Sequence, residues 1–192
     1  MSKTTTRDVT SLLADGTAAG SWVLDPAGSR AGFHVKHFWG AIAVHGTFER
    51  MTGEASVRQD GTVTARISLD ASSVNTKHKQ RDQHLRSADF FHADKHPHAI
   101  LTVTSARPAG PSQLECQGSF AAAGHARPVT FTAQIEQATA QTVVLTSELA
   151  IDRAAFGMTW SPLHMASMTA RGTFTARFTH HAEGSTSHGD RR

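Results

Sequence analysis

The chain has 192 residues and a formal net charge of +3, from 19 Lys and Arg against 16 Asp and Glu. This length fits one domain that buries enough surface to need neither a disulfide nor a structural metal. The charge excess is too small to argue for a nucleic-acid partner, and the single cysteine, Cys116, excludes an intramolecular disulfide. We therefore expect one globular domain that does not bind nucleic acid.

The two ends of the chain differ from its centre. Residues 1–20 and 182–192 are rich in Gly, Ser, Thr, Ala and charge without hydrophobic periodicity, so we expect flexible segments around a domain at 21–181. The first twenty residues lack the apolar run of a secretory signal, and no stretch approaches the roughly 18 apolar residues of a membrane span. These features favour a cytoplasmic protein without stable membrane insertion.

Apolar and polar residues alternate along most of the domain, which is typical of strands with one buried and one wet face. Strands are predicted, in chain order, at 21–25, 30–38, 41–49, 52–58, 63–69, 98–106, 114–120, 129–135, 142–151 and 168–178. The pattern fits either a sandwich or a barrel. We favour an all-β fold in which about eight antiparallel strands form a closed barrel, because closure removes exposed sheet edges.

Two segments interrupt the alternation. The polar run at 76–87 predicts about two turns of helix, near 77–87, on the surface or at the mouth of the barrel. Further along, Asp152 is placed to cap a single helical turn that Gly157 would close.

Small residues recur on the predicted inward face among larger apolar ones. They are Ala65, Cys116, Gly118, Ala133, Ser147, Ala170 and Gly172. In a barrel of about eight strands, such residues are compatible with a ligand tunnel or with tapered packing of a filled core. Both alternatives stay open at this point.

The chain carries no common catalytic motif. G-x-S-x-G, H-E-x-x-H, P-loop and G-x-G-x-x-G sequences are absent, and Cys116 falls on the apolar face, where an inert thiol is expected. We therefore predict no catalytic residue and no cofactor.

Thirteen histidines raise the alternative of a metal-binding barrel or a metal-dependent enzyme. The densest group is His92, His96 and His98, of which the last two would share one face of a strand. Pro97 interrupts the group and no glutamate follows at a suitable distance, so we predict no metal. His37 would share a face with Phe33 and Val35, either as a core residue or as a polar anchor for a ligand.

Three segments resemble the YceI-like family of polyisoprenoid-binding proteins. They are WVLDPAGSRAGFHVKHFWGAIAVHGTFERMTGEASV at 22–57, RDQHLRSADFF at 81–91 and DRAAFGMTW at 152–160, of which the second is the most specific. The resemblance implies an extended, lipocalin-like antiparallel barrel without enzymatic activity. It also implies a tunnel for a long-chain isoprenoid lipid, of the quinone or polyprenyl phosphate type, which the protein would carry or sequester.

The resemblance, together with residue type and face, suggests a set of site residues. The expected ligand-binding residues are Phe33, Val35, His37, Phe48, Leu85, Phe90, Phe91, Phe131, Phe156, Trp160 and Phe174, and the head-group candidates are Arg81, His84 and Arg86. Alternatively, Arg81, Asp82 and His84 form a hydrogen-bond network that holds the helical segment on the barrel. The expected partner is the lipid, and the chain could also form a homodimer. The alternative to a carrier is a stress-response interaction module with a filled barrel.

Overall fold

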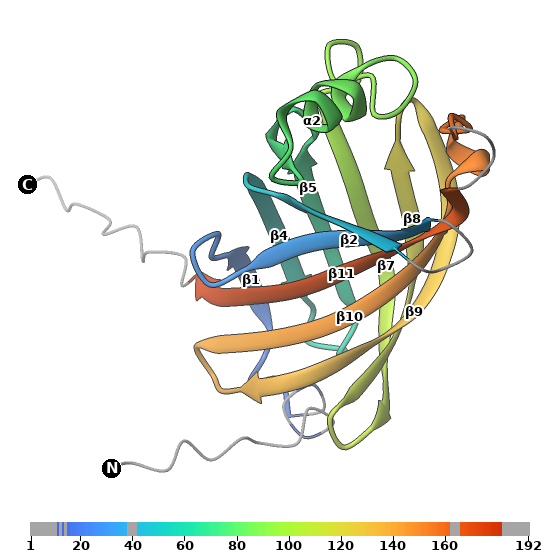
Figure 1. The fold of residues 1–192 in the computed structure, drawn as a ribbon. Helices are drawn as coiled ribbons and strands as arrows, with labels where there is room; N and C mark the ends of the chain where they lie inside the picture. Colours follow the sequence, from blue (N-terminus) through green and yellow to red (C-terminus); the bar gives the residue numbers. More distant parts are fainter. Residues whose placement is uncertain (1–10, 12, 14, 38–41, 162–165, 182–192) are drawn as a thin grey trace, which may run out of the picture.

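The strands form one antiparallel sheet that closes on itself (Figure 1). The computed structural model describes residues 11, 13, 15–37, 42–161 and 166–181. The strands in this part of the chain are β1 Gly20–Leu24, β2 Arg30–His37, β3 Ile42–Phe48, β4 Met51–Val57, β5 Val63–Asp70, β6 Val74–Asn75, β7 His98–Gly110, β8 Gln113–Ala122, β9 His125–Ala138, β10 Thr142–Asp152 and β11 Ala166–His181. A helix, α2 Lys79–Arg86, and two 3-10 turns, η2 Ala71–Ser73 and η3 Ala154–Phe156, connect them.

These strands occupy eight positions around the barrel. The closed ring runs β1–β4–β5–β7–β8–β9–β10–β11, and β11 pairs again with β1. β1 and β2 lie end to end along β11, since Leu24 pairs with Phe178 and Arg30 pairs with Thr175. In the same way β3 extends β4 and β6 extends β5. The predicted closed barrel of about eight strands is confirmed, and three of its strands are interrupted.

Side chains alternate between the interior and the outer face, as the sequence predicts. Ile67 and Leu69 in β5 are buried while Arg66 is exposed, and buried Cys116 in β8 lies between exposed Glu115 and Gln117. The interior is one apolar cluster drawn from all eight strand positions. The period-two pattern therefore identifies the core correctly.

A serine bridges the break between β1 and β2. The Ser29 hydroxyl donates to the Asp25 carbonyl over 2.7 Å and accepts from the Arg177 amide of β11 over 3.0 Å. Because Ser29 is buried, its hydroxyl serves as the hydrogen-bond acceptor for the Arg177 amide that a backbone carbonyl would provide in an unbroken strand. The strand can therefore bend while its neighbour stays paired.

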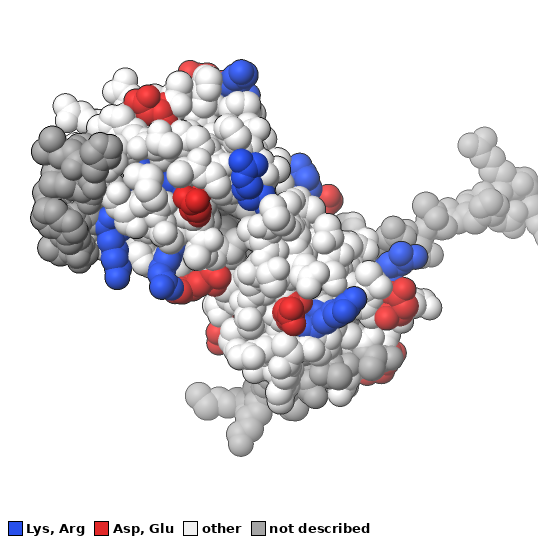
Figure 2. Space-filling view, turned by 90° about the vertical axis from the view of Figure 1, so that its right-hand side faces the viewer, with Lys and Arg blue, Asp and Glu red and all other residues white. Residues whose placement is uncertain are grey.

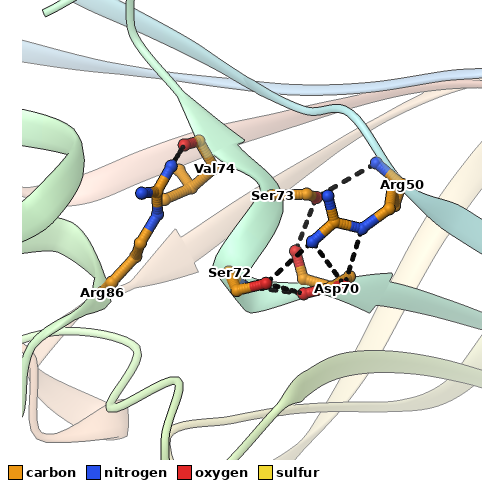
Figure 3. A network of polar contacts seen from close by, with 6 residues as sticks. All are labelled: Arg50, Asp70, Ser72, Ser73, Val74 and Arg86. Atoms are coloured by element: carbon orange, nitrogen blue, oxygen red, sulfur yellow. Dashed lines mark hydrogen bonds and ion pairs between the residues drawn. The ribbon is translucent and has the colours of Figure 1, made fainter. Parts of the chain in front are cut away.

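A second polar network holds the break between β5 and β6 (Figure 3). The Arg50 guanidinium donates to the Asp70 carboxylate over 2.9 Å and to the Ser72 hydroxyl over 2.8 Å. The Ser73 hydroxyl accepts from the Arg50 amide over 3.0 Å. Because these bonds hold η2 against β4, the chain turns from β5 into β6 in a defined direction.

Above this break the ring is no longer closed by strand pairing. β5 pairs with β7 as far as Asp70 opposite His98, whereas β6 pairs with β3. The chain between β6 and β7 forms α2 and the loop at 87–97, which lie at one end of the barrel, drawn at the top of Figure 1. We call this the upper end.

At the opposite, lower end, part of the predicted flexible segment 1–20 packs against the barrel. Leu13 and Ala18 are buried, and the indole nitrogen of Trp22 donates to the Ala18 carbonyl over 2.9 Å. These contacts differ from the expectation of a free segment because isolated apolar residues, without any periodicity, are sufficient to cover a barrel end. Residues 1–10 and 182–192 lie outside the described residues.

Candidate functional site

The barrel interior contains two cavities that meet at Phe174. The upper cavity measures about 140 Å³ and the lower cavity about 130 Å³, and Phe174 lines both. Along β11 the upper cavity is lined from Ala166 to Phe174 and the lower cavity from Phe174 to Phe178. The two cavities therefore lie end to end along the barrel.

The upper cavity is rich in aromatic residues. It is lined by Gly32, Phe33, Val35, Val44, Phe48, Leu69, Arg81, His84, Leu85, Phe90, Phe91, Phe120, Ile151, Arg153, Phe156, Met158, Trp160, Ala166, Ala170, Gly172 and Phe174. The lower cavity is mainly aliphatic, with lining residues that include Leu13, Trp22, Ala65, Ile67, Leu101, Cys116, Phe131, Ala133, Ile135, Leu145, Ser147 and Phe178. Six of the seven small inward residues line one cavity or the other, so the interior is not completely filled.

Aromatic rings pack against one another around the upper cavity. The Phe48 ring contacts Phe33 at a centroid distance of 5.9 Å and Phe91 at 5.3 Å, and Phe120 contacts Phe156 at 5.6 Å. A Cβ atom at Gly46 would overlap the Phe33 ring, so glycine is required there for the ring to occupy its position. These contacts fix an apolar wall made from strands, loop and η3.

A hydrogen-bond network joins α2 to the end of β6. The Asp82 carboxylate accepts from the Thr76 amide over 2.7 Å and from its hydroxyl over 2.6 Å. The Arg81 guanidinium donates to the Thr76 hydroxyl over 2.7 Å and to its carbonyl over 3.0 Å. Burial acts to raise the pKa of Asp82, but the bonds from Thr76 and the charges of Arg86 and Arg81 outweigh it and hold the pKa below its usual value.

Two of the three head-group candidates line the upper cavity, and the third does not. Arg81 and His84 are lining residues. Arg86 instead donates to the Val74 carbonyl over 2.8 Å (Figure 3) and is absent from the lining. Arg86 as a head-group contact is thus corrected, because its guanidinium is used to hold α2 against β6.

His84 lies at the rim of the upper cavity. Its Nε2 atom is 2.8 Å from the Asp89 carboxylate, and its ring packs edge-on against Trp160 at 4.4 Å and Phe90 at 5.1 Å. Trp160 is 43% exposed, so the rim combines an exposed indole with a polar pair. Of the proposed Arg81, Asp82 and His84 network, the first two share Thr76, whereas His84 pairs elsewhere.

Arg153 lines the same cavity, although the sequence analysis did not select it. It follows β10, where Leu149 and Ile151 face inward, so the period of two directs Arg153 inward as well. Its guanidinium donates to the Ser167 carbonyl over 2.9 Å and to the Trp160 carbonyl over 2.8 Å. Gly157 closes η3 in the left-handed conformation, as predicted. The predicted cap at Asp152 is wrong, because η3 begins after Arg153, which makes no side-chain capping bond; Asp152 lies one residue earlier and accepts from the Ala154 amide over 3.0 Å.

The other expected lipid contacts divide between the cavities. Phe33, Val35, Phe48, Leu85, Phe90, Phe91, Phe156 and Trp160 line the upper cavity, Phe174 lines both and Phe131 lines the lower one. His37 ends β2, and its side chain lies outside the described residues. Of the expected ligand-binding residues, all but His37 thus line a cavity, and the sequence does not separate the upper cavity from the lower one.

Cys116 lies in the wall of the lower cavity. Burial raises the pKa of its thiol to about 11. A thiol with this pKa is almost entirely protonated at neutral pH, and the thiolate is the nucleophilic form. The residue contributes apolar surface in this position.

The histidine group does not gather into a metal site. His92 and His96 lie in the loop before β7, with ring centroids 5.6 Å apart, while His98 begins β7 opposite Asp70. Among the residues with described positions, no three His, Cys, Asp or Glu side chains are grouped as metal ligands. The shared strand face that the metal alternative requires is missing, because the chain turns between His92 and His98 rather than running straight.

Charged side chains on the outer surface are mixed in sign. On the face that Figure 2 shows, Lys and Arg are scattered and several lie beside Asp or Glu. Arg171 and Glu148, for example, pair across β11 and β10 at 3.3 Å. A search of the helices in the described part of the chain finds none with the length and apolar character of a membrane span.

Comparison with known sequences and structures agrees with this geometry. The YceI-like domain matches residues 22–181. Protein YceI of Shigella flexneri is 31% identical over 126 residues, which cover 64% of this chain and 65% of that protein's length. The aligned region thus spans somewhat less than two thirds of this relative.

Two solved structures are similar in fold. BcnA of Burkholderia cenocepacia has a TM-score of 0.73 at 19% identity, covering 80% of this chain and 98% of that one. A polyisoprenoid binding domain from Saccharophagus degradans has a TM-score of 0.70 at 15% identity, covering 83% and 98%. At these identities the two structures support the barrel architecture alone.

Proposed function

Because the chain belongs to the YceI-like family, we propose that it binds a long-chain isoprenoid lipid inside the barrel and carries or sequesters it without chemical conversion. The similar domain from Saccharophagus degradans is described as polyisoprenoid binding. The observation that carries the proposal is the pair of apolar cavities that meet at Phe174. An extended hydrocarbon chain matches two cavities in line better than a compact ligand does.

The energetic argument is apolar burial. Each Å² of hydrocarbon removed from water contributes about 25 cal/mol, and a long isoprenoid offers several hundred Å². Enclosed apolar pockets with a few polar groups at one end are the usual form of such sites. Here the arginine and histidine side chains of the lining, Arg81, His84 and Arg153, all belong to the upper cavity, so we place the lipid head at the upper end and the chain below it.

The test is to purify the full chain without an affinity tag, extract it with organic solvent and analyse the extract by mass spectrometry. We expect a polyprenyl compound, of the quinone or polyprenyl phosphate type, in near-stoichiometric amount. An extract containing mixed fatty acids would contradict isoprenoid selectivity. An empty extract, together with no binding of added isoprenoid, would favour a filled-barrel interaction module.

A further inference from the structure

Among the residues that the structure describes, Arg153 is a buried cation without a charged partner. It is 6% exposed, and its guanidinium donates hydrogen bonds to two neutral backbone carbonyls, those of Ser167 and Trp160. The ion pairs found in the described part of the chain are Arg50–Asp70, His84–Asp89, Arg171–Glu148 and Arg177–Asp25, and none includes Arg153. Buried arginines are normally paired with an acid, so this arrangement needs an explanation.

The acidic side chains described near Arg153 do not pair with its guanidinium. Asp82 accepts from Thr76, Asp89 pairs with His84, and Asp152 is exposed and accepts from the Ala154 amide. Burial lowers the pKa of Arg153 from its usual value, yet a guanidinium remains protonated in proteins. A positive charge therefore lies in the wall of the upper cavity, whose lining is apolar apart from Arg153, Arg81 and His84.

The Arg153 guanidinium is also held in place. Two of its five N–H donors bind carbonyls, and the Phe90 ring lies 5.3 Å from its central carbon. The other arginines near the upper end are occupied differently, because Arg81 binds Thr76 and Arg86 binds Val74. Arg153 thus combines burial, fixed geometry and donors that these bonds leave available at the cavity wall.

We propose that Arg153 binds the anionic head of the lipid in the upper cavity, so that the protein selects a phosphate or carboxylate lipid over a neutral one. This inference rests on the proposed function. A phosphate or carboxylate oxygen would accept the remaining N–H donors and neutralise the buried charge, which the hydroxyl of an alcohol or the carbonyl of a quinone cannot do. Of the ligand classes considered, the inference favours polyprenyl phosphates over quinones.

The test compares two ligands with the same chain, farnesyl phosphate and farnesol, on the full-length protein, with Trp fluorescence or calorimetry as the readout. We expect the phosphate to bind about tenfold or more tightly than the alcohol, as charge-assisted hydrogen bonds imply. Arg153→Gln should abolish the preference, so that farnesyl phosphate and farnesol bind the variant with equal affinity. Arg171→Gln, on the outer face, is the matched control and should keep the preference.

Two further measurements keep the result decisive if Arg153→Gln does not fold. In the wild-type protein, the side-chain N–H resonance of Arg153, assigned with Arg153→Lys, should shift with farnesyl phosphate and not with farnesol. Hexadecanoate tests carboxylate lipids. If its binding depends on Arg153 as strongly as the binding of farnesyl phosphate does, carboxylate lipids are a second class of anionic ligand. Equal affinity for phosphate and alcohol, or an unshifted resonance, would overturn this inference while leaving isoprenoid binding intact; failure of both ligands to bind would instead overturn the proposed function.

Discussion

The upper and lower cavities are built by the same alternating strands but are closed in different ways. The lower cavity lies where neighbouring strands pair, and Leu13 and Ala18 are among its apolar lining residues. The upper cavity lies where β6 and β7 separate, and α2 and η3 contribute lining residues that include Arg81 and Phe156. The paired strands thus enclose an apolar cavity, whereas the interruptions bring charged side chains into the lining of the upper cavity.

This difference between the upper and lower cavities predicts that they bind different parts of a lipid. The upper cavity would hold the head and the first isoprene units, and the lower cavity would hold the remainder of a longer chain. Phe174, which lines both, is the point that a long chain must pass. The following predictions, from the largest effect to the smallest, test whether the two cavities act as one site.

The largest expected effect comes from a charge placed in either cavity. Phe33→Glu in the upper cavity and Phe131→Glu in the lower cavity are a matched pair, because both rings are half-buried lining residues. We expect Phe33→Glu to weaken binding of C15 and C40 isoprenoid alcohols by about a hundredfold, since a carboxyl group must be desolvated. Phe131→Glu should weaken only the C40 alcohol, by about tenfold.

Fluorescence titration measures these affinities, and thermal unfolding checks that both variants are folded. Equal loss of C15 binding in the two variants would contradict the division into head and chain cavities. Retention of binding in Phe33→Glu would remove the upper cavity from the site.

A smaller effect is expected on stability, from the network that holds α2. Asp82→Asn should lower the free energy of unfolding by about 1–3 kcal/mol, because Asp82 accepts two hydrogen bonds from Thr76 beside Arg81 and Arg86. Urea unfolding measures this value. Asp89→Asn is the control, since its partner His84 is partly exposed, and it should cost less than about 1 kcal/mol.

The same pair of variants gives a pH test. The pKa of Asp82 is held below its usual value, so the folded protein binds this proton more weakly than the unfolded chain does. The stabilisation is therefore complete above the unfolded pKa of about 3.9 and is lost as the pH falls through the lower, folded value. The difference between wild type and Asp82→Asn should shrink below about pH 4; a constant difference would show that the charge of Asp82 has no part in it.

The smallest effect is a change in thiol reactivity. With a pKa of about 11, about one Cys116 thiol in 10,000 is ionised at pH 7, so a thiol reagent should label it slowly in the native protein and rapidly after unfolding. A C40 alcohol should slow native labelling further, and a C15 alcohol should not, because Cys116 lines the lower cavity. Equal protection by both would contradict the separate roles of the two cavities.

The sequence predicts the barrel because alternation records which side chains face inward, strand by strand. It predicts α2 and η3 because a polar run, Asp152 and Gly157 signal local interruptions. It predicts separate strands on either side of the break between β1 and β2, but not that these strands lie end to end along β11, and it does not predict β6. These arrangements depend on side chains such as Ser29 and Arg50 that bond to distant strands. Hydrogen bonds between residues far apart in the sequence produce no periodic pattern of apolar and polar residues.

The candidate site was predicted in part for the same reason. Aromatic residues at inward positions identify the upper wall, but residue type alone does not distinguish the roles of three arginines. Arg81 and Arg86 bond to residues at the end of β6, whereas the buried Arg153 bonds to the Ser167 carbonyl of β11. The inward position of Arg153, two residues after Ile151, was the available signal.

The short strand β6 has a further consequence for the behaviour of the protein in concentrated solution. Among the described strands it pairs with β3 alone, so its other side is a sheet edge, the kind of surface on which chains recruit one another and aggregate. Arg86 occupies the Val74 carbonyl, and Arg81 and Asp82 occupy the backbone of Thr76. The residues that hold α2 in place therefore also keep this edge from acting as a template for strand addition by another copy of the chain.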